Sequence, residues 1–343
     1  MKNAKIIAIL LLAVFVALFV LRSCSGNGNK EDKNHTTTQQ QQVIEPPAFN
    51  SDSALAYIQT QVNFGPRVPN TDAHKKCGDW IASELKRHGA SVMEQKSTAE
   101  TWDKKNIEVR NIVGAFNPEA KKRIVLAAHW DTRAYGDKDS LEVNKKKPID
   151  GANDGASGVG VLLELARLMA IQKPTLGIDL IFFDAEDNGA PEWAPEEEQG
   201  NPYNWCLGSQ YWSKNFHKPN YNARFGILLD MVGAKNARFN KEGFSVEAAP
   251  DLVDRVWKTA SNLGYGEYFP NEVTGEIVDD HVFMNQSGIR SIDIVDMRPA
   301  TKTMGFNGYE FGSFHHTHKD NMSIISKETL KAVGHTVSYV MYN

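Results

Sequence analysis

The stretch IDLIFFDAED, residues 178–187, decides the fold of this chain. Its first six residues are mostly apolar, which predicts a short strand buried on both faces, as at the centre of a parallel sheet. The strand ends in three acids, Asp184, Glu186 and Asp187, and Asn188-Gly189 then stops it. Because successive side chains of a regular strand point to opposite faces, we expect the loop to turn one acid onto a metal and leave its neighbour as a base. The alternative is a solvated acidic loop, and this stretch alone does not decide between them.

The composition indicates one large globular domain. The chain has 343 residues, 41% of them hydrophobic, and a net charge of −4. A mixed, nearly neutral charge gives no sign of a nucleic-acid partner. The three cysteines, Cys24, Cys77 and Cys206, form no disulfide framework, although one bridge between Cys77 and Cys206 is possible.

The N-terminus predicts export. Two lysines in residues 1–5 precede an apolar run over 6–21, so residues 1–24 are expected to be a signal peptide or an N-terminal membrane anchor. The sequence before Cys24 resembles a bacterial lipoprotein cleavage site, from which Arg22 departs. Either interpretation places the protein in the periplasm or cell envelope, and an anchor, lipid or peptide, is favoured.

The segment 25–48 is polar and low in complexity, which predicts a disordered linker. The catalytic domain is expected to span 49–343. Strand patterns in this domain alternate with helical ones, which predicts an α/β fold with a mixed central sheet, mostly parallel and flanked by helices. The expected strands are 91–95, 109–116, 124–128, 178–183, 225–231 and 291–296, and the expected helices are 51–64, 71–88, 155–170, 209–216, 251–263 and 326–342.

Possible metal ligands follow several of these strands. They are His129, Asp154, Glu186, Asp187, Asp230 and His316. Imidazole and carboxylate ligands together suit zinc, and Asp154, Asp187 and His316 would make a three-ligand set with one open position. A metal that only stabilises the structure is the alternative.

Seven motifs carry a family resemblance. They are FGPRVP at 64–69, HWDTR at 129–133, GANDGASG at 151–158, FFDAED at 182–187, LLDMVGA at 228–234, DDHVFMNQSGI at 279–289 and HHTHKDN at 315–321. From about Phe64 onward the chain resembles the zinc aminopeptidase superfamily, which includes the animal-type glutaminyl-peptide cyclotransferases. The resemblance implies zinc on Asp154, Asp187 and His316, with Glu186 as general acid and base. Asp187 stands where the family usually has glutamate, a ligand with longer reach.

The resemblance leaves two enzyme classes open. Two-zinc aminopeptidases also use His129 and Asp230, and both residues are present here. Three features favour the cyclase: Asp279 beside Asp280, an insertion after the acid pair that brings Trp193, and the close match of residues 228–234 to the cyclase pattern. The alternatives are loop or core packing for Trp193 and a helix cap for Asp279.

Two departures concern the substrate pocket. His315 stands where the cyclases have tryptophan, and residues 306–314 contain extra positions. Phe311 is the best match for the apolar wall that would face the substrate together with Trp193.

The expected function is therefore conversion of N-terminal glutamine of peptides or proteins to pyroglutamate, with release of ammonia and one zinc per chain. Glu186 would carry the proton, and Asp279, hydrogen-bonded toward Asp230, would hold the amide nitrogen. That contact would draw Asp230 away from His129 and leave a second metal site unassembled. The other hypotheses are an exported di-zinc aminopeptidase and a tethered binding protein without catalysis.

Overall fold

Six strands form the central sheet of this protein, in the order β1-β2-β4-β3-β5-β6. The computed structural model describes residues 43–300 and 307–343, so the predicted signal or anchor and most of the predicted linker lie outside the described residues. The strands are β1 Ser91–Glu100, β2 Asn106–Phe116, β3 Arg123–His129, β4 Gly177–Phe183, β5 Gly226–Asp230 and β6 Ser291–Val295. A two-stranded sheet pairs β7 Met297–Pro299 with β8 Tyr309–Phe311.

The sheet is mixed. Strands β4, β3, β5 and β6 pair in parallel, whereas β1 and β2 add an antiparallel edge. The prediction of an α/β fold with a mostly parallel centre is confirmed. The 178–187 stretch behaves as expected, since every residue of β4 is buried. Leu180 and Phe182 enter the large core on one face, and Ile181 and Phe183 enter a second core on the other.

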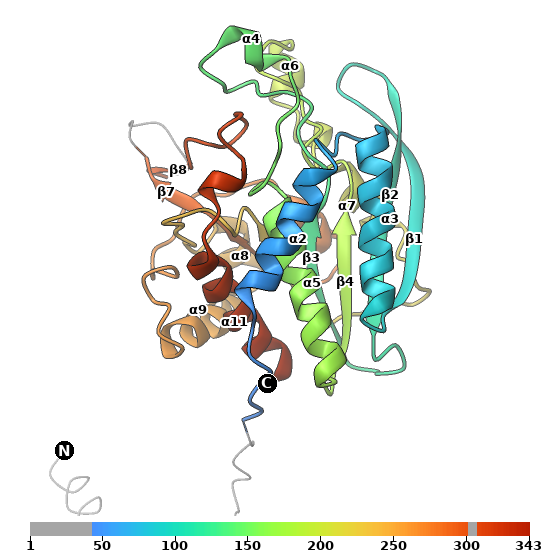
Figure 1. The fold of residues 1–343 in the computed structure, drawn as a ribbon, viewed down its shortest axis with the longest axis vertical. Helices are drawn as coiled ribbons and strands as arrows, with labels where there is room; N and C mark the ends of the chain where they lie inside the picture. Colours follow the sequence, from blue (N-terminus) through green and yellow to red (C-terminus); the bar gives the residue numbers. More distant parts are fainter. Residues whose placement is uncertain (1–42, 301–306) are drawn as a thin grey trace, which may run out of the picture. The chain divides into compact units, whose positions relative to one another are not determined.

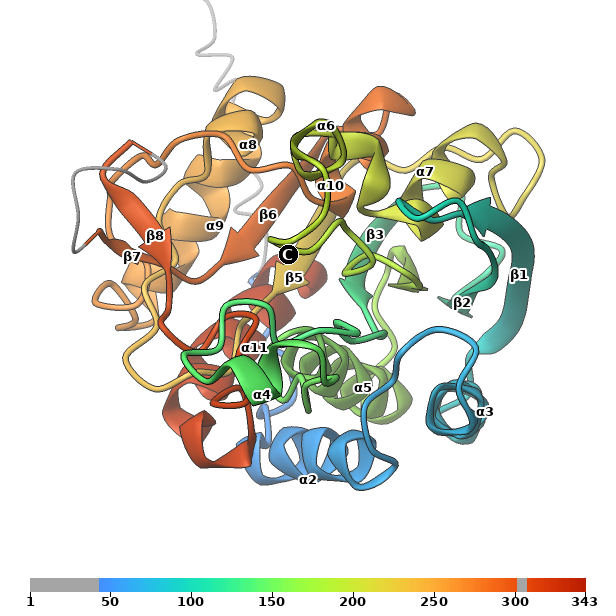
Figure 2. The ribbon, with the colours of Figure 1, turned by 90° about the horizontal axis from the view of Figure 1, so that it is seen from above.

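Helices cover both faces (Figures 1 and 2). On one side α2, α3, α5 and α11 pack around the large core, and α7 and α10 pack against the other face. The helices of four residues or more are α2 Ser51–Asn63, α3 Asp72–Arg87, α4 Glu142–Lys145, α5 Ala156–Ile171, α6 Glu196–Gln199, α7 Leu207–Lys214, α8 Gly243–Ala248, α9 Pro250–Asn262, α10 Asp280–Gln286 and α11 Lys327–Tyr342. None within 43–300 and 307–343 is long and apolar enough to cross a membrane.

The chain makes contacts with this body before the predicted domain start at residue 49. The backbone N–H of Ile44 donates to the side chain of Asn343 at 2.7 Å, and the Asn343 amide donates to the Ile44 carbonyl at 2.9 Å. Gln172, which follows α5, donates to the carbonyl of Glu45. These bonds lie at the C-terminal end of α5, opposite the end at which β3, β4 and β5 deliver their acids.

Candidate active site

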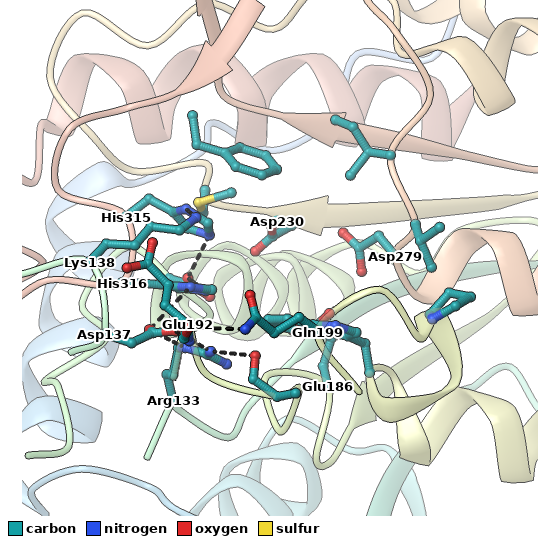
Figure 3. A pocket seen from close by; sticks show the side chains of 18 of the residues that line it. Arg133, Asp137, Lys138, Glu186, Glu192, Gln199, Asp230, Asp279, His315 and His316 are labelled. Carbon is teal, nitrogen blue, oxygen red and sulfur yellow. Dashed lines mark hydrogen bonds and ion pairs between the residues drawn. The ribbon is translucent and has the colours of Figure 1, made fainter. Parts of the chain in front are cut away.

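A cavity of about 420 Å³ lies where β3, β4 and β5 end (Figure 3). His129 ends β3, Glu186 and Asp187 follow β4, Asp230 ends β5, and Asp154 precedes α5. Side chains from several strand ends therefore meet at one edge of the sheet, as is usual for parallel sheets. The lining includes Arg133, Lys138, Asp154, Glu186, Trp205, Asp230, Ile277, Val278, Asp279, Phe311, His315 and His316.

Residues with positive φ redirect the chain at three of these points. Ala185 (φ 54°) follows β4, Met231 (φ 49°) follows β5, and His316 has φ 56°. This left-handed conformation is unfavourable for residues with a Cβ. At Ala185 this conformation ends the regular alternation of side chains along β4. Asp187 then faces His316, whereas Glu186 faces Asp279.

The first group of ligand atoms joins Asp154, Asp187 and His316. His316 Nε2 lies 3.2 Å from Asp187 Oδ1 and 3.8 Å from Asp154 Oδ2. The other oxygen of Asp187, Oδ2, is buried and has no hydrogen-bond partner among the described residues. Burial and the adjacent Asp154 raise the pKa of Asp187 well above its usual value. Two buried carboxylates, one of them with an unpartnered oxygen, and an imidazole fit a divalent cation such as zinc.

The second group joins His129, Asp154 and Asp230. His129 Nε2 lies 3.0 Å from Asp154 Oδ1 and 3.2 Å from Asp230 Oδ1. Burial acts to lower the pKa of His129, but hydrogen bonds to Asp131, Asp154 and Asp230 outweigh it and hold that pKa well above its usual value. The ligand atoms of His129, Asp154 and Asp230 all lie within 4.8 Å of one another, which is close enough to share a metal ion.

Two aspartates that the sequence analysis did not single out fix the ligand loops. Asp131 accepts hydrogen bonds from the backbone N–H groups of Glu186 (3.1 Å) and Asp187 (3.2 Å). Asp320 does the same for the backbone N–H of Asp154 at 3.0 Å. Both lie in quoted motifs, HWDTR and HHTHKDN, but the residue type alone did not distinguish a loop anchor from a ligand.

Glu186 lies among acids and a thiol. Its side chain accepts a hydrogen bond from Cys206 Sγ at 3.3 Å, and the three ligand atoms of Glu186, Cys206 and Asp279 lie within 4.8 Å of one another. Burial raises the pKa of Glu186 well above its usual value, and the neighbouring Asp279 adds to this. Burial also raises the pKa of the Cys206 thiol. A carboxyl group with a raised pKa, beside a thiol and a second carboxyl group, is the kind of group that acid–base chemistry uses.

Asp279 is the N-cap of α10, and its side chain accepts from the backbone N–H of Asp280. It is therefore a helix cap and a cavity residue at once. The expected hydrogen bond between Asp279 and Asp230 stays a prediction. In this structure Asp230 Oδ1 lies 3.2 Å from His129 Nε2, so Asp230 is not drawn away from His129.

The apolar wall differs from the one expected. Phe311 lines the cavity, but Trp193 is not among the lining residues. The Trp193 side chain is 41% exposed and packs edge-to-face on Tyr135, with ring centroids 5.2 Å apart. Trp205, from the same insertion, lies on the cavity wall instead, nearly parallel to the His316 ring at 5.9 Å.

Arg133 ties the insertion to the ligand loop. Its guanidinium pairs with Asp137 at 2.7 Å and approaches Asp187 Oδ1 at 3.3 Å, and it lies over the Trp205 ring at 4.8 Å. The cation next to Asp187 offsets part of the cost of burying that carboxylate. Cys77 and Cys206 are both free and buried, so the possible bridge between them is not formed.

Comparisons with known proteins agree with this geometry. The model of peptidase family M28 matches residues 111–341. A solved structure of Bacteroides thetaiotaomicron glutaminyl cyclase bound to N-acetylhistamine is 51% identical, with a TM-score of 0.83, covering 87% of this chain and 99% of that one.

Two further relatives carry names from two different enzyme classes. A Zn-dependent exopeptidase from Parabacteroides distasonis is 53% identical, with a TM-score of 0.83, covering 87% of this chain and 100% of that one. A glutaminyl-peptide cyclotransferase from Drosophila melanogaster is 26% identical over an alignment of 289 positions, which covers 77% of this chain and 73% of that protein.

Proposed function

The chain belongs to peptidase family M28, and from that premise we propose that it is a glutaminyl-peptide cyclotransferase. It converts N-terminal glutamine of peptides and proteins to pyroglutamate and releases ammonia. The observation that carries the proposal is the pair of neighbouring carboxyl groups, Glu186 and Asp279, which line the same cavity as His316. The glutaminyl cyclases among its relatives support the same reaction.

Asp154, Asp187 and His316 would hold one zinc ion. When bound, zinc supplies a Lewis acid for the carbonyl oxygen of the side-chain amide. The carboxylate of Asp137 lies 3.8 Å from His316 Nδ1, which is too far for a hydrogen bond, and that nitrogen has no hydrogen-bond partner among the described residues. A small approach of Asp137 would give this histidine the acceptor that usually orients a metal-binding imidazole.

The chain's own residues carry the proton transfers. In the reaction the α-amino nitrogen of the substrate forms a bond to its side-chain amide carbon, and the bond from that carbon to the amide nitrogen breaks. Glu186 takes a proton from the attacking amine and gives one to the departing nitrogen, which leaves as ammonia. Asp279 accepts a hydrogen bond from that nitrogen and fixes its position. Phe311 and Ile277 limit the conformers available to the substrate, which favours an intramolecular attack.

An aminopeptidase is the second candidate, and one observation favours it. His129, Asp154 and Asp230 are held together, so the ligands for a second metal are present in one place. A related exopeptidase of similar identity keeps this candidate open. Asp279 argues against it, because a peptidase needs no carboxylate aimed at a leaving amide nitrogen.

The test offers the purified protein a glutaminyl peptide and, separately, a leucyl chromogenic amide, and measures ammonia and free amine. We expect ammonia from the first and no amine from the second. Asp279→Ser is the matched variant, because serine can still cap α10 while the carboxylate is removed. It should abolish cyclisation and keep the zinc. The peptidase would be established if the protein bound two zinc ions per chain and released free amine from the leucyl amide, both before and after Asp279→Ser.

The proposal extends to location. Residues 1–24 would direct export and retain the protein at the membrane, and 25–48 would separate the enzyme from it, which places catalysis in the periplasm or cell envelope. Cell fractionation, with Cys24→Ala as the variant that blocks lipidation, tests this. Release of only the variant from the membrane fraction supports a lipid anchor, and retention of both supports a peptide anchor.

A further inference from the structure

His315 and His316 are adjacent in sequence, and both imidazoles face the cavity (Figure 3). The positive φ of His316 allows this, because consecutive side chains of extended backbone would point apart. Their ring centroids are 3.6 Å apart. Two neighbouring histidines thus reach the same group of carboxylates, and the structure must decide which of them binds metal.

The distances alone do not exclude His315 as a metal ligand. Its Nε2 lies 4.0 Å from Asp154 Oδ2, compared with 3.8 Å for Nε2 of His316. The ligand atoms of Asp154, His315 and His316 all lie within 4.8 Å of one another. Ligands at about 2.1 Å from a tetrahedral zinc lie about 3.4 Å apart, so a small shift would bring His315 into the fourth position. That position must stay open for a substrate to reach the metal.

The surroundings of the two Nδ1 atoms differ. His316 Nδ1 has no hydrogen-bond partner among the described residues, and a carboxylate oxygen of Asp137 lies 3.8 Å from it. His315 presents Nδ1 to the ammonium of Lys138, at 3.0 Å. An ammonium has three donors and no acceptor, so Nδ1 of His315 must accept. A neutral imidazole that accepts at one nitrogen carries its proton on the other, and a protonated Nε2 cannot bind a metal.

We propose that Lys138 is a positioning residue that keeps His315 off the metal. It holds His315 as the Nε2–H tautomer, which makes that ring a hydrogen-bond donor in the cavity and leaves the fourth zinc position to the substrate. Lys138 is itself held in place, since its backbone N–H donates to the carbonyl of His316 at 3.2 Å. The inference rests on the proposed zinc ligands Asp154, Asp187 and His316.

The variants are Lys138→Met, Lys138→Arg and Lys138→Met combined with His315→Phe, and zinc affinity is measured by competition with a chelator. Once Lys138 is lost, His315 can bind zinc, so Lys138→Met should hold zinc about 10- to 100-fold more tightly and turn over more slowly. Lys138→Arg keeps the donor and should resemble the unmodified protein. Lys138→Met also removes a positive charge, so the double variant is the decisive control. It is compared with a fourth variant, His315→Phe alone, and the zinc affinities of these two should match.

A second readout needs no metal. The ¹⁵N shifts of His315 in the zinc-free protein should show the Nε2–H tautomer, and Lys138→Met should shift the ring toward Nδ1–H. Tight zinc binding that persists in the double variant would overturn the inference, as would unchanged affinity in Lys138→Met or an Nδ1–H tautomer in the unmodified protein. Absence of zinc from the unmodified protein would refute the proposed function instead.

Discussion

Replacing Asp230 with asparagine should make the metal-free protein more stable, and increasingly so as the pH rises. Burial raises the pKa of Asp230 from 3.8 to about 7, and Asp154 and Asp279 add to the effect. Between these values the folded protein holds a proton that the unfolded chain has released. The contribution of this carboxyl to stability therefore falls as the pH rises from about 4 and is lost above about 7.

The magnitude follows from that pKa. Each pKa unit corresponds to about 1.4 kcal/mol, so the ionised Asp230 costs the folded state about 4 kcal/mol at pH 7 and above. Because part of this cost comes from the neighbouring carboxyl groups rather than from Asp230 alone, we expect Asp230→Asn to gain about 2 to 4 kcal/mol at pH 8 and nothing at pH 4. The asparagine oxygen can still accept from His129 Nε2, 3.2 Å away, so the local geometry is kept.

Urea unfolding of the metal-free protein at pH 4, 6 and 8 measures this difference. The matched control is Asp254→Asn, since the Asp254 side chain is 75% exposed and its pair with Lys241 is solvated. The control should show no pH-dependent gain. A gain for Asp230→Asn that is absent at pH 8, or equal at all three values, would show that Asp230 is not held in a buried cluster of acids.

Three further outcomes are expected. Glu186→Gln should keep zinc and fold while kcat falls about 10²- to 10⁴-fold, because shape is preserved and proton transfer is not; near-native kcat by ammonia release would assign the base elsewhere. Asp154→Ala and His316→Ala should each lose most of the zinc by metal analysis, and full occupancy in both would refute the ligand set. Burial lowers the pKa of His217 to about 4, so stability should fall as the pH drops from about 6.5 to 4, by up to about 3 kcal/mol. His217→Gln should flatten that part of the curve in urea unfolding, and an unchanged slope would contradict the burial of this ring.

The sequence predicted the central elements of the fold well, because strands buried on both faces are apolar throughout. β4 and β3 are of this kind. The prediction was weaker where burial is partial. β1 continues to Glu100, five residues beyond the predicted end, as an edge strand whose polar residues are satisfied by pairing with β2. The short helix α10 entered the sequence prediction only as the alternative in which Asp279 caps a helix, since seven residues carry too little periodicity to identify one.

The acids of the cavity were identified because strand ends in one parallel sheet converge, whatever the loops do. Phe311 was expected on the cavity wall and lines it, but the tryptophan of the wall was not identified. The insertion holds two tryptophans, Trp193 and Trp205, and loop composition does not say which one turns inward. Gly189 decides it: a Cβ at that position would lie 1.9 Å from the Trp205 ring, so only glycine leaves room for this indole. Lys138 and His315 likewise reach each other across 177 residues of sequence.

The bonds between Ile44 and Asn343 have a practical consequence for handling the protein. They fix the point where the chain joins the body near the C-terminal end of α5, while Asp154 precedes the N-terminal end of that helix. A helix of 16 residues is about 24 Å long, so the attachment point and the cavity lie near opposite ends of α5. An enzyme coupled to a bead or sensor surface through the segment before Val43 would keep its cavity mouth open to large folded substrates, whereas coupling through α4 or α6 would obstruct it.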